Sequence, residues 1–364
     1  MARLGDIATV ITKGTTPTSI GFAFQNKGIN FVKIESIDEN GNFIDEKFDH
    51  ISDECHKKLK RSQLQENDVL FSIAGAIGRT AIVTKNILPA NINQALAIIR
   101  IPQGIINYSF LLYILQSSAV LEQAEKKQQG VAQLNVSLKD IGDFIIPDIP
   151  LAKQQKIVDN LDKVSNLISL RKQQLSRLDE LVKSRFIEMF GDVITNSKKW
   201  EVKNWNSVLS IKNGRNQKQV ENPTGKYPIC GSGGIMGYAD DYITTENSVI
   251  VGRKGNINKP ILMREKYWNV DTAFGLEPKT DVLLVDYLYM YCVFFNFETL
   301  NKAVTIPSLT KADLLNIEMP VPPLDLQNQF ADFVEQVDKS KLAVQKSLEK
   351  LETLKKALMQ KYFG

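Results

Sequence analysis

Two stretches of the chain carry apolar residues at a spacing of three and four, which is the pattern of an amphipathic helix. The first stretch contains Ile157, Leu161, Val164, Ile168, Leu175, Leu178 and Val182. The second contains Phe330, Val334, Val337, Val344, Leu348, Leu351 and Leu358. Neither stretch has an internal proline or glycine. The pattern predicts two long helices, over residues 151–191 and 324–364, each about 60 Å long.

The ends of both helices are marked by residues that start and stop helices. Each helix follows a proline-bearing turn, IIPDIPL at 145–151 and MPVPPL at 319–324, and proline suits the first helical turn. Gly191 and Gly364 stand where a C-terminal capping glycine belongs. A lone helix with one narrow apolar seam needs a partner, so we expect the two helices to pair with each other.

The regions before the helices show the patterns of mixed α and β structure. Short apolar runs between Gly, Asn and Pro signals predict strands. These runs are GINFVKI, DVLFSI, TAIV and ALAIIRI in the first region, and SVIVG, PILM and FGLEP in the second. Residues 107–128 and 285–303 are predicted to be helical. The expected fold class is α+β, with two mixed domains and two long helices forming an antiparallel coiled coil.

The chain also repeats itself. Pro147, Pro150, Leu151 and Gln154 recur 173 residues later as Pro320, Pro323, Leu324 and Gln327. Upstream the match is looser, with an offset of 180 between Gly75 and Gly255 and of 200 between Gly14 and Gly214. The rear of each repeat has kept its register while the front has drifted, which suggests a variable module joined to a fixed spacer. The expected domains are residues 1–150, 151–191, 192–323 and 324–364.

Composition limits the class of protein. Hydrophobic residues make up 43% of the 364 residues, enough to bury sizeable cores. No signal peptide is expected, because Arg3 and Asp6 follow Met1 without a long apolar run. The most apolar stretch, 285–297, is too short to span a bilayer. The 3 cysteines are far apart, which excludes a disulfide framework or a CxxC metal motif and suits the reducing cytoplasm.

Net charge gives only weak support for a polyanionic partner. The whole chain carries +4, and the four expected domains carry −1, +3, +1 and +1 in chain order. Bulk charge of this size does not establish DNA binding. If phosphates are contacted, folding must bring the cations together.

Several motifs resemble those of the specificity subunits of type I restriction-modification systems. The first half shows GTTP at 14–17, LKRSQLQENDVLFSIAGAIG at 59–78, NINQALAII at 91–99 and VAQLNVSLKDIGDFIIPDIPLAKQQKIVDNLD at 131–162. The second half shows YPICGSGGIMGYADDY at 227–242, IVGRKGNIN at 250–258 and IPSLTKADLLNIEMPVPPLDLQNQF at 306–330. Their order and duplication, together with the two helices, make the resemblance specific, and it covers essentially the whole chain.

The resemblance implies a protein that recognises DNA sequence and is not itself an enzyme. Two target recognition domains would each read one half of a split double-stranded sequence, and the helices would set the gap. Half-sites about 34–36 Å apart, or a multiple of that, suit helices of this length. Two modification subunits would dock and methylate adenine, one in each half-site, and restriction subunits can join them. No cofactor is expected on this chain, because S-adenosylmethionine and ATP belong to those partners.

Polar turns of the second half are candidate DNA contacts. Arginine can fork onto guanine, lysine can meet guanine or phosphate, and asparagine can pair with adenine. The turn around Gly255 brings these three residue types together, and the glycine-rich turn before it can offer backbone amides to a phosphate. Solvated surface turns are the alternative. The candidates are Asn213, Arg215, Lys218, Ser232, Arg253, Lys254 and Asn256.

The first half offers a matching set. Residues 13–16 match the polar run at 213–216, and Arg79 ends the turn that matches 253–256. The segment NINQ at 91–94 either reads adenine or builds a turn. The candidates are Lys13, Thr15, Thr16, Arg79, Asn91, Asn93 and Gln94.

Two other classes of function stay open. A coiled-coil scaffold that binds only proteins explains the helices but not the paired polar loops. A self-sufficient DNA-modifying enzyme would need an (N/D)PP(Y/F)-type methyltransferase loop, which the chain lacks, or a nuclease carboxylate cluster. The segment Asp45-Glu46-Lys47 has the local nuclease pattern without a matching upstream acid.

Overall fold

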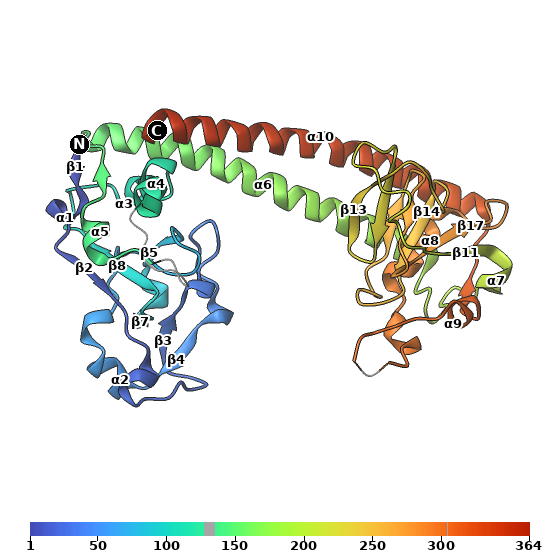
Figure 1. Cartoon of the computed structure of the whole chain (residues 1–364), viewed down its shortest axis with the longest axis horizontal. Coiled ribbons are helices and arrows are strands. Elements are labelled where there is room, and N and C mark those ends of the chain that lie inside the picture. The colour runs from blue at the N-terminus through green and yellow to red at the C-terminus, as the bar shows by residue number, and fades with distance from the viewer. Residues whose placement is uncertain (127–134, 304) are drawn as a thin grey trace. The chain divides into compact units, whose positions relative to one another are not determined.

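A computed structural model describes residues 1–126, 135–303 and 305–364 (Figure 1). The chain packs as two units, which we call unit 1 (Met1–Leu170 with Leu348–Gly364) and unit 2 (Arg171–Ser347). Each unit contains a β-rich region and part of each of two 40-residue helices, α6 (Leu151–Phe190) and α10 (Leu324–Phe363). The α+β class with two long helices is confirmed.

Unit 1 is built on a four-stranded antiparallel sheet of the order β2-β8-β5-β6. These strands are β2 (Val10–Lys13), β8 (Leu96–Arg100), β5 (Val69–Ser72) and β6 (Thr80–Ile82). A three-stranded sheet has the order β4-β3-β7, with β4 (Asp49–Ile51), β3 (Ile29–Val32) and β7 (Ala90–Ile92). β3 pairs in parallel with β7, and β1 (Ala2–Arg3) pairs with β9 (Ile145–Ile146).

Unit 2 repeats this strand order. Its four-stranded sheet runs β11-β17-β14-β15, with β11 (Leu209–Asn213), β17 (Ala273–Pro278), β14 (Ser248–Gly252) and β15 (Ile261–Met263). Its three-stranded sheet runs β13-β12-β16, with β13 (Gly234–Ala239), β12 (Tyr227–Gly231) and β16 (Trp268–Asn269), and β12 pairs in parallel with β16. β10 (Val202–Asn204) pairs with β18 (Glu318–Pro320). The repeat seen in the sequence is therefore also a repeat of strand pairing.

Some of the shorter helices also correspond. Unit 1 has α1 (Leu4–Ile7), α2 (Asp53–Lys58), α3 (Tyr108–Leu115), α4 (Ser118–Lys126) and α5 (Leu138–Gly142). Unit 2 has α7 (Trp205–Val208), α8 (Val285–Phe294) and α9 (Lys311–Leu315). α5 and α9 begin alike, because the hydroxyls of Ser137 and Thr310 accept the N–H groups of Asp140 and Asp313.

Two predicted helices are shorter than expected. The stretch 107–128 splits into α3 and α4, because the Ser117 hydroxyl bonds to the carbonyl of Ile114 and accepts the N–H of Val120, which restarts the helix. Residues 127–134, and with them the first part of the motif at 131–162, lie outside the described residues. The stretch 285–303 stays helical only to Phe294, because the Asn296 side chain caps a separate 3₁₀ turn.

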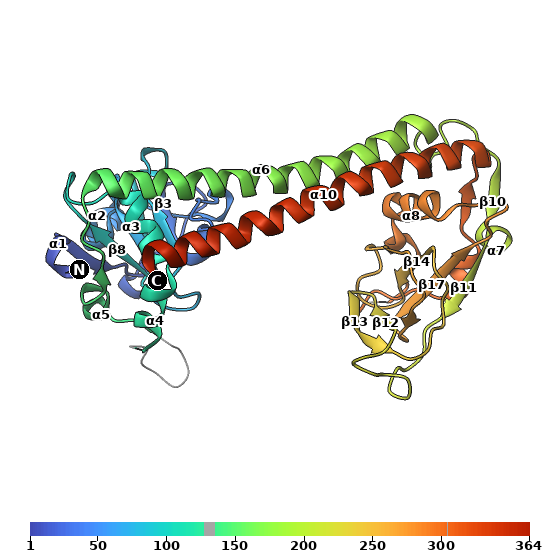
Figure 2. The ribbon, with the colours of Figure 1, turned by 90° about the horizontal axis from the view of Figure 1, so that it is seen from above.

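The long helices lie side by side in both views (Figures 1 and 2). In unit 2, Phe186 of α6 packs edge-on against Phe330 of α10, and Lys341 forms an ion pair with Asp179 at 2.6 Å. Residue numbers thus rise along α6 as they fall along α10, so the helices are antiparallel there. In unit 1, Phe363 of α10 packs against Phe110 of α3 with ring centroids 5.4 Å apart.

A buried glutamine near the start of each long helix ties that helix to its unit. The Gln154 side chain accepts the N–H of Asn107 at 2.8 Å and donates to the carbonyl of Ile149 at 2.8 Å. Gln327 accepts the N–H of Leu284 at 2.8 Å and donates to the carbonyls of Val282 and Pro322. Both amides are almost wholly buried and bonded. Because a buried amide without partners is costly, these bonds fix how each helix meets its unit.

Candidate nucleic-acid interface

Four of the predicted contacts of unit 1 share one surface. Lys13 ends β2, and Gln94 lies between β7 and β8. Two neighbouring cavities of about 620 and 560 Å³ are both lined by Lys13 and Gln94, and Thr15 and Thr16 line the second. The Thr16 hydroxyl donates to the Gln94 side-chain oxygen. β2 and β5 are both antiparallel to β8, so the turns that follow them leave the sheet at the same edge.

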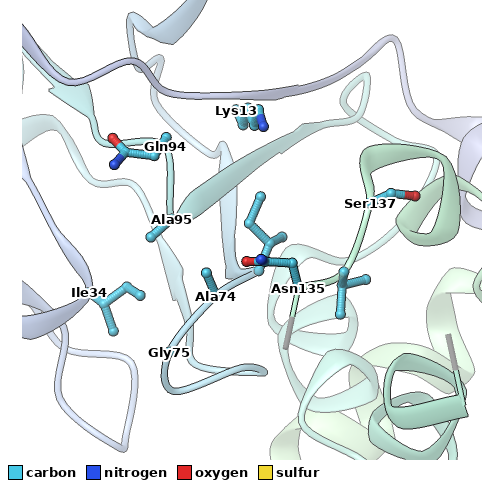
Figure 3. Close-up of a pocket in the computed structure, with 10 residues that line it drawn as sticks. Lys13, Ile34, Ala74, Gly75, Gln94, Ala95, Asn135 and Ser137 are labelled. Carbon is cyan, nitrogen blue, oxygen red and sulfur yellow. The ribbon is translucent and has the colours of Figure 1, made fainter. Parts of the chain in front are cut away.

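The larger cavity is also lined by two segments that lie far apart in the sequence, residues 73–75 and 135–137. Figure 3 shows Lys13, Gln94, Asn135 and Ser137 around it, with the turn at Gly75 on one side. Ile73 donates its N–H to the carbonyl of Ala95 at 2.9 Å and accepts that of Val136 at 3.0 Å. None of the ten lining residues is acidic. We call this surface, residues 13–16, 73–75, 93–95 and 135–137, the loop face of unit 1.

Gly14 allows the turn after β2 to pack closely against the backbone at Ile92. A Cβ at Gly14 would lie 2.0 Å from the carbonyl oxygen of Ile92, closer than any side chain allows. Gly214 stands in the same relation to Val270, at 1.8 Å. The close approach of the two backbones explains why both halves keep a glycine at this position while the residues around it differ.

Three other predicted residues of unit 1 serve the fold. Asn91 is fully buried, and its amide donates to the carbonyl of Leu59 and the hydroxyl of Ser62, so it is not free to pair with adenine and we remove it from the candidates. Arg79 donates through Nη1 to the carbonyls of Ile34 and Ile37 at 3.1 and 3.0 Å. Asn93 accepts the N–H of Ala95 at 3.2 Å, which is the turn-building alternative.

In unit 2, Ser232, Arg253, Lys254 and Asn256 come together. A Cβ at Gly252 would lie 3.0 Å from the Cβ of Ser232, and one at Gly233 would lie 3.9 Å from the Asn256 side-chain nitrogen. The N–H groups of Arg253 and Lys254 both donate to the carbonyl of Thr272, at 2.8 and 3.3 Å. Residues 253, 254 and 256 are exposed, and the Arg253 guanidinium carbon lies 5.8 Å from the centroid of the Phe274 ring.

The polar run of residues 213–218 leaves the same edge of the sheet. β11 and β14 flank β17, and Asn213 and Val251 both pair with Phe274. Arg215 is held by its backbone, which donates to the carbonyl of Asn269 and accepts the indole N–H of Trp268, each at 3.0 Å. The side chains of Asn213, Arg215 and Lys218 are exposed. We call residues 213–218, 231–234, 253–256, 271–272 and 308–310 the loop face of unit 2.

The two loop faces have the same backbone frame. Ala74 forms a bridge with Asn135, and Lys254 forms one with Ser308. Ile77 donates to the carbonyl of Gly75, and Ile257 to that of Gly255, both at 2.9 Å. Gly75 and Gly255 have φ of 70° and 79°, where glycine is favoured. At the same positions unit 1 carries the buried Ile73 and the half-buried Ala74, whereas unit 2 carries the exposed Arg253 and Lys254, so one frame presents different side chains to solvent.

Comparison with known proteins identifies the family. Residues 1–180 and 197–355 match the type I restriction modification DNA specificity domain. The chain belongs to this family. It is similar to the EcoBI type I specificity subunit of Escherichia coli, 32% identical over 42% of this chain and 33% of that protein. It is 25% identical to the putative MjaX specificity subunit of Methanocaldococcus jannaschii over 98% of this chain and 91% of that protein.

Solved structures of type I systems have the same fold. The S subunit from M. genitalium aligns with a TM-score of 0.60 and 15% identity, over 100% of this chain and 95% of that one. A chain from a study of type I complex assembly aligns with a TM-score of 0.62 and 20% identity, over 100% and 96%. The family match, with this fold, makes the chain a DNA specificity subunit, the non-catalytic part of a type I restriction-modification complex.

The cysteines of the specificity subunit are not reactive thiols. Cys55, Cys230 and Cys292 are all buried, and burial raises the pKa of each, that of Cys230 to about 12. A thiol with a raised pKa is a poor nucleophile near neutral pH. The described part of the chain holds no His, Cys, Asp and Glu cluster suited to a metal ion, and none of its helices could cross a membrane.

Sequence reasoning missed one element of the specificity subunit's loop faces. Residues 135–137 and 308–310 complete the two faces, yet in the sequence they stand out only as parts of longer motifs. The offset of 173 between them is the offset of the long helices. This shared offset was the available signal. A segment that keeps the offset of the long helices but pairs with the variable domain is expected to lie where the helix and that domain meet.

Proposed function

We propose that the loop faces of units 1 and 2 each read one half of a bipartite double-stranded DNA target. One observation carries the proposal: two frames with the same main-chain bonds present different side chains. Reading two different half-sites requires this combination. Both units must dock on the DNA backbone in the same way, while the side chains that contact the bases must differ. Lys13, Thr15, Thr16 and Gln94 would act for unit 1. Asn213, Arg215, Lys218, Ser232, Arg253, Lys254 and Asn256 would act for unit 2.

The division of labour follows from the residue types. Arg253 can bond both acceptors of a guanine edge, Asn256 and Gln94 can pair with adenine, and Lys13 and Lys254 can meet phosphates. The rigid main chain behind them lowers the entropy lost on binding. Arg79 and Asn93, held in the fold, would support the face and contact the backbone of DNA at most.

The rest of the complex supplies the chemistry. We propose that α6 and α10 set the gap between half-sites, and that two modification subunits dock on the chain and methylate one adenine in each half-site. Restriction subunits would join the same assembly. S-adenosylmethionine and ATP would bind those partners, which work on DNA in the cytoplasm.

Methylome sequencing of cells that carry this chain with its modification subunits tests the proposal. The expected result is methylated adenine in a split motif whose two halves are separated by a fixed run of unread bases. A continuous motif, or methylation without sequence preference, would contradict two-domain reading. Matched cells that lack only this chain should show no such motif.

The purified chain separates the other two classes of function. Binding of duplex DNA that carries the split motif, without methyl transfer, supports the specificity role. A chain that forms complexes with proteins but never discriminates among duplexes would be a scaffold. Methyl transfer by the chain alone would make it a self-sufficient enzyme.

A further inference from the structure

The hairpin β12–β13 of unit 2 exposes apolar side chains beside the polar contacts. Ile235 and Met236 are 58% and 59% exposed, and Tyr238 is 45% exposed. The hairpin turns in two residues, Ser232 and Gly233, because Gly231 pairs with Gly234. Figure 1 shows β13 as a yellow strand of this unit.

A β-bulge accounts for the double exposure. Ile229 pairs with Gly237 and Cys230 with Ile235, so Met236 is an extra residue on β13. In a regular strand, neighbours point to opposite faces, and one of the two would be directed inward. The bulge breaks the alternation at Met236 and leaves both side chains in solvent.

Exposed apolar residues on an edge strand need a reason. Natural edge strands are protected by charge or by covering segments, because an uncovered apolar edge promotes aggregation. Among the described residues, the segment at Glu221 and Asn222 covers β13 only near Tyr238 and Ala239. The corresponding edge strand of unit 1, β4, has polar Asp49 and His50, and its Ile51 is buried.

The apolar pair lies against the loop face. A Cβ at Gly231 would lie 3.1 Å from the Met236 sulfur and 3.7 Å from the Thr272 hydroxyl. Thr272 is the residue whose carbonyl accepts the N–H groups of Arg253 and Lys254. The Met236 side chain therefore lies near Thr272, and Thr272 holds the main chain of the two exposed cations, Arg253 and Lys254.

We propose that Ile235 and Met236 contact the 5-methyl group of a thymine in the half-site read by unit 2. A two-stranded ribbon fits the major groove, where thymine alone presents a methyl group, and apolar side chains recognise it by contact. Cations on the adjacent turn favour an anionic partner over another protein, and the bulge presents both side chains from one tight hairpin. This inference rests on the proposed function of the loop faces.

Single replacement of thymine by deoxyuridine removes only the methyl group, so it isolates the contact. The complex with its modification subunits is titrated with duplexes of the target in which each thymine of the half-site is replaced in turn, at fixed salt. The native complex should lose about fourfold in affinity at one thymine, the effect of one buried methyl-sized group. The Ile235→Ala/Met236→Ala complex should bind the parent duplex more weakly and be insensitive to deoxyuridine at that position.

Ile194→Ala provides the matched control, because Ile194 is 51% exposed but lies in the loop after α6. It should keep the native deoxyuridine response. Thermal unfolding of all variants should coincide, since only exposed side chains change. The inference is overturned if no thymine is sensitive, if hairpin variants keep the native response, or if they lower only assembly with the modification subunits. If the native complex bound no duplex that carries the split motif, the proposed function itself would be wrong.

Discussion

Unit 1 and unit 2 share one backbone frame but carry different side chains on their loop faces. Their sheets share strand order, and the turns after β5 and β14 are held by equivalent main-chain bonds. Yet the connection from β3 to β4 takes 16 residues and contains two 3₁₀ turns, while β12 and β13 are joined by two residues. Because the shared bonds use backbone atoms, side chains on the loops can change without loss of the frame.

At one equivalent position of the sheet the two units carry side chains of opposite charge. Arg100 pairs opposite Val10 in unit 1, and Glu277 pairs opposite Ser210 in unit 2. Arg100 bonds the buried Asp68 at 2.6 and 2.7 Å. Glu277 instead accepts bonds from Thr245 and Ser210 and pairs with Lys212. A conserved frame therefore tolerates opposite charges, provided that each is paired locally.

The largest test of independence is exchange of one reading domain. Replacing residues 192–323 with the same region of a relative should change one half of the methylated motif completely and leave the other half intact. Methylome sequencing of the exchanged strain measures this, and exchange of residues 1–150 is the reciprocal control. Change in both halves after either exchange would contradict separate reading.

Spacer length should change the gap and nothing else. One added helical turn in both α6 and α10 lengthens each helix by about 6 Å, so the gap should grow by about one or two base pairs with both half-sites kept. The same sequencing detects it. A gap unaffected by matched insertions would remove the proposed role of the helices.

Removal of Arg100 should destabilise the fold more than removal of the charge of Glu277 at the equivalent position. Arg100→Met leaves the buried Asp68 carboxylate with the N–H of Gln65 but without its cationic partner, and should lower the free energy of unfolding by about 3 kcal/mol, measured with urea. Adding Asp68→Asn should restore part of the loss. If the double variant were no more stable than the single one, the ion pair would not be the cause.

Arg253 tests whether unit 2 reads bases where unit 1 has Ile73. Arg253→Ala should cost about 1–3 kcal/mol in binding and relax one base position. The exposed Arg177 on α6 gives the control, and Arg177→Ala should leave the base preference unchanged. Equal loss for all sequences would mark Arg253 as a phosphate contact.

The smallest effect concerns acid stability. Burial raises the pKa of Glu277, but bonds from Thr245 and Ser210 and the charge of Lys212 outweigh it, so the pKa is lower than usual. Folding therefore favours the carboxylate, and this stabilisation is present above the ordinary pKa and lost as pH falls through the folded value. Glu277→Gln should cost about 1 kcal/mol at pH 7. The cost should shrink under acid titration, and a pH-independent difference would contradict this account.

Sequence patterns predicted the parts of the fold that depend on periodicity. The α6 and α10 seams and the buried runs of β5, β8 and β14 were visible because many residues repeat one spacing. The split between α3 and α4 was not, because it depends on the single hydroxyl of Ser117. Asn91 looked like a base reader, and its burial arises from contacts with Leu59 and Ser62, about 30 residues away in the chain. Such long-range partners leave no local pattern.

Gln154 and Gln327 have a consequence for how these proteins diversify. Their amides bond to main-chain groups: Gln154 to the N–H of Asn107 and the carbonyl of Ile149, and Gln327 to the N–H of Leu284 and the carbonyls of Val282 and Pro322. Main-chain groups are the same whatever amino acid occupies the position. These bonds of each long helix therefore do not depend on which side chains the front module carries at the bonded positions. A change of module sequence at these positions leaves this part of the joint intact.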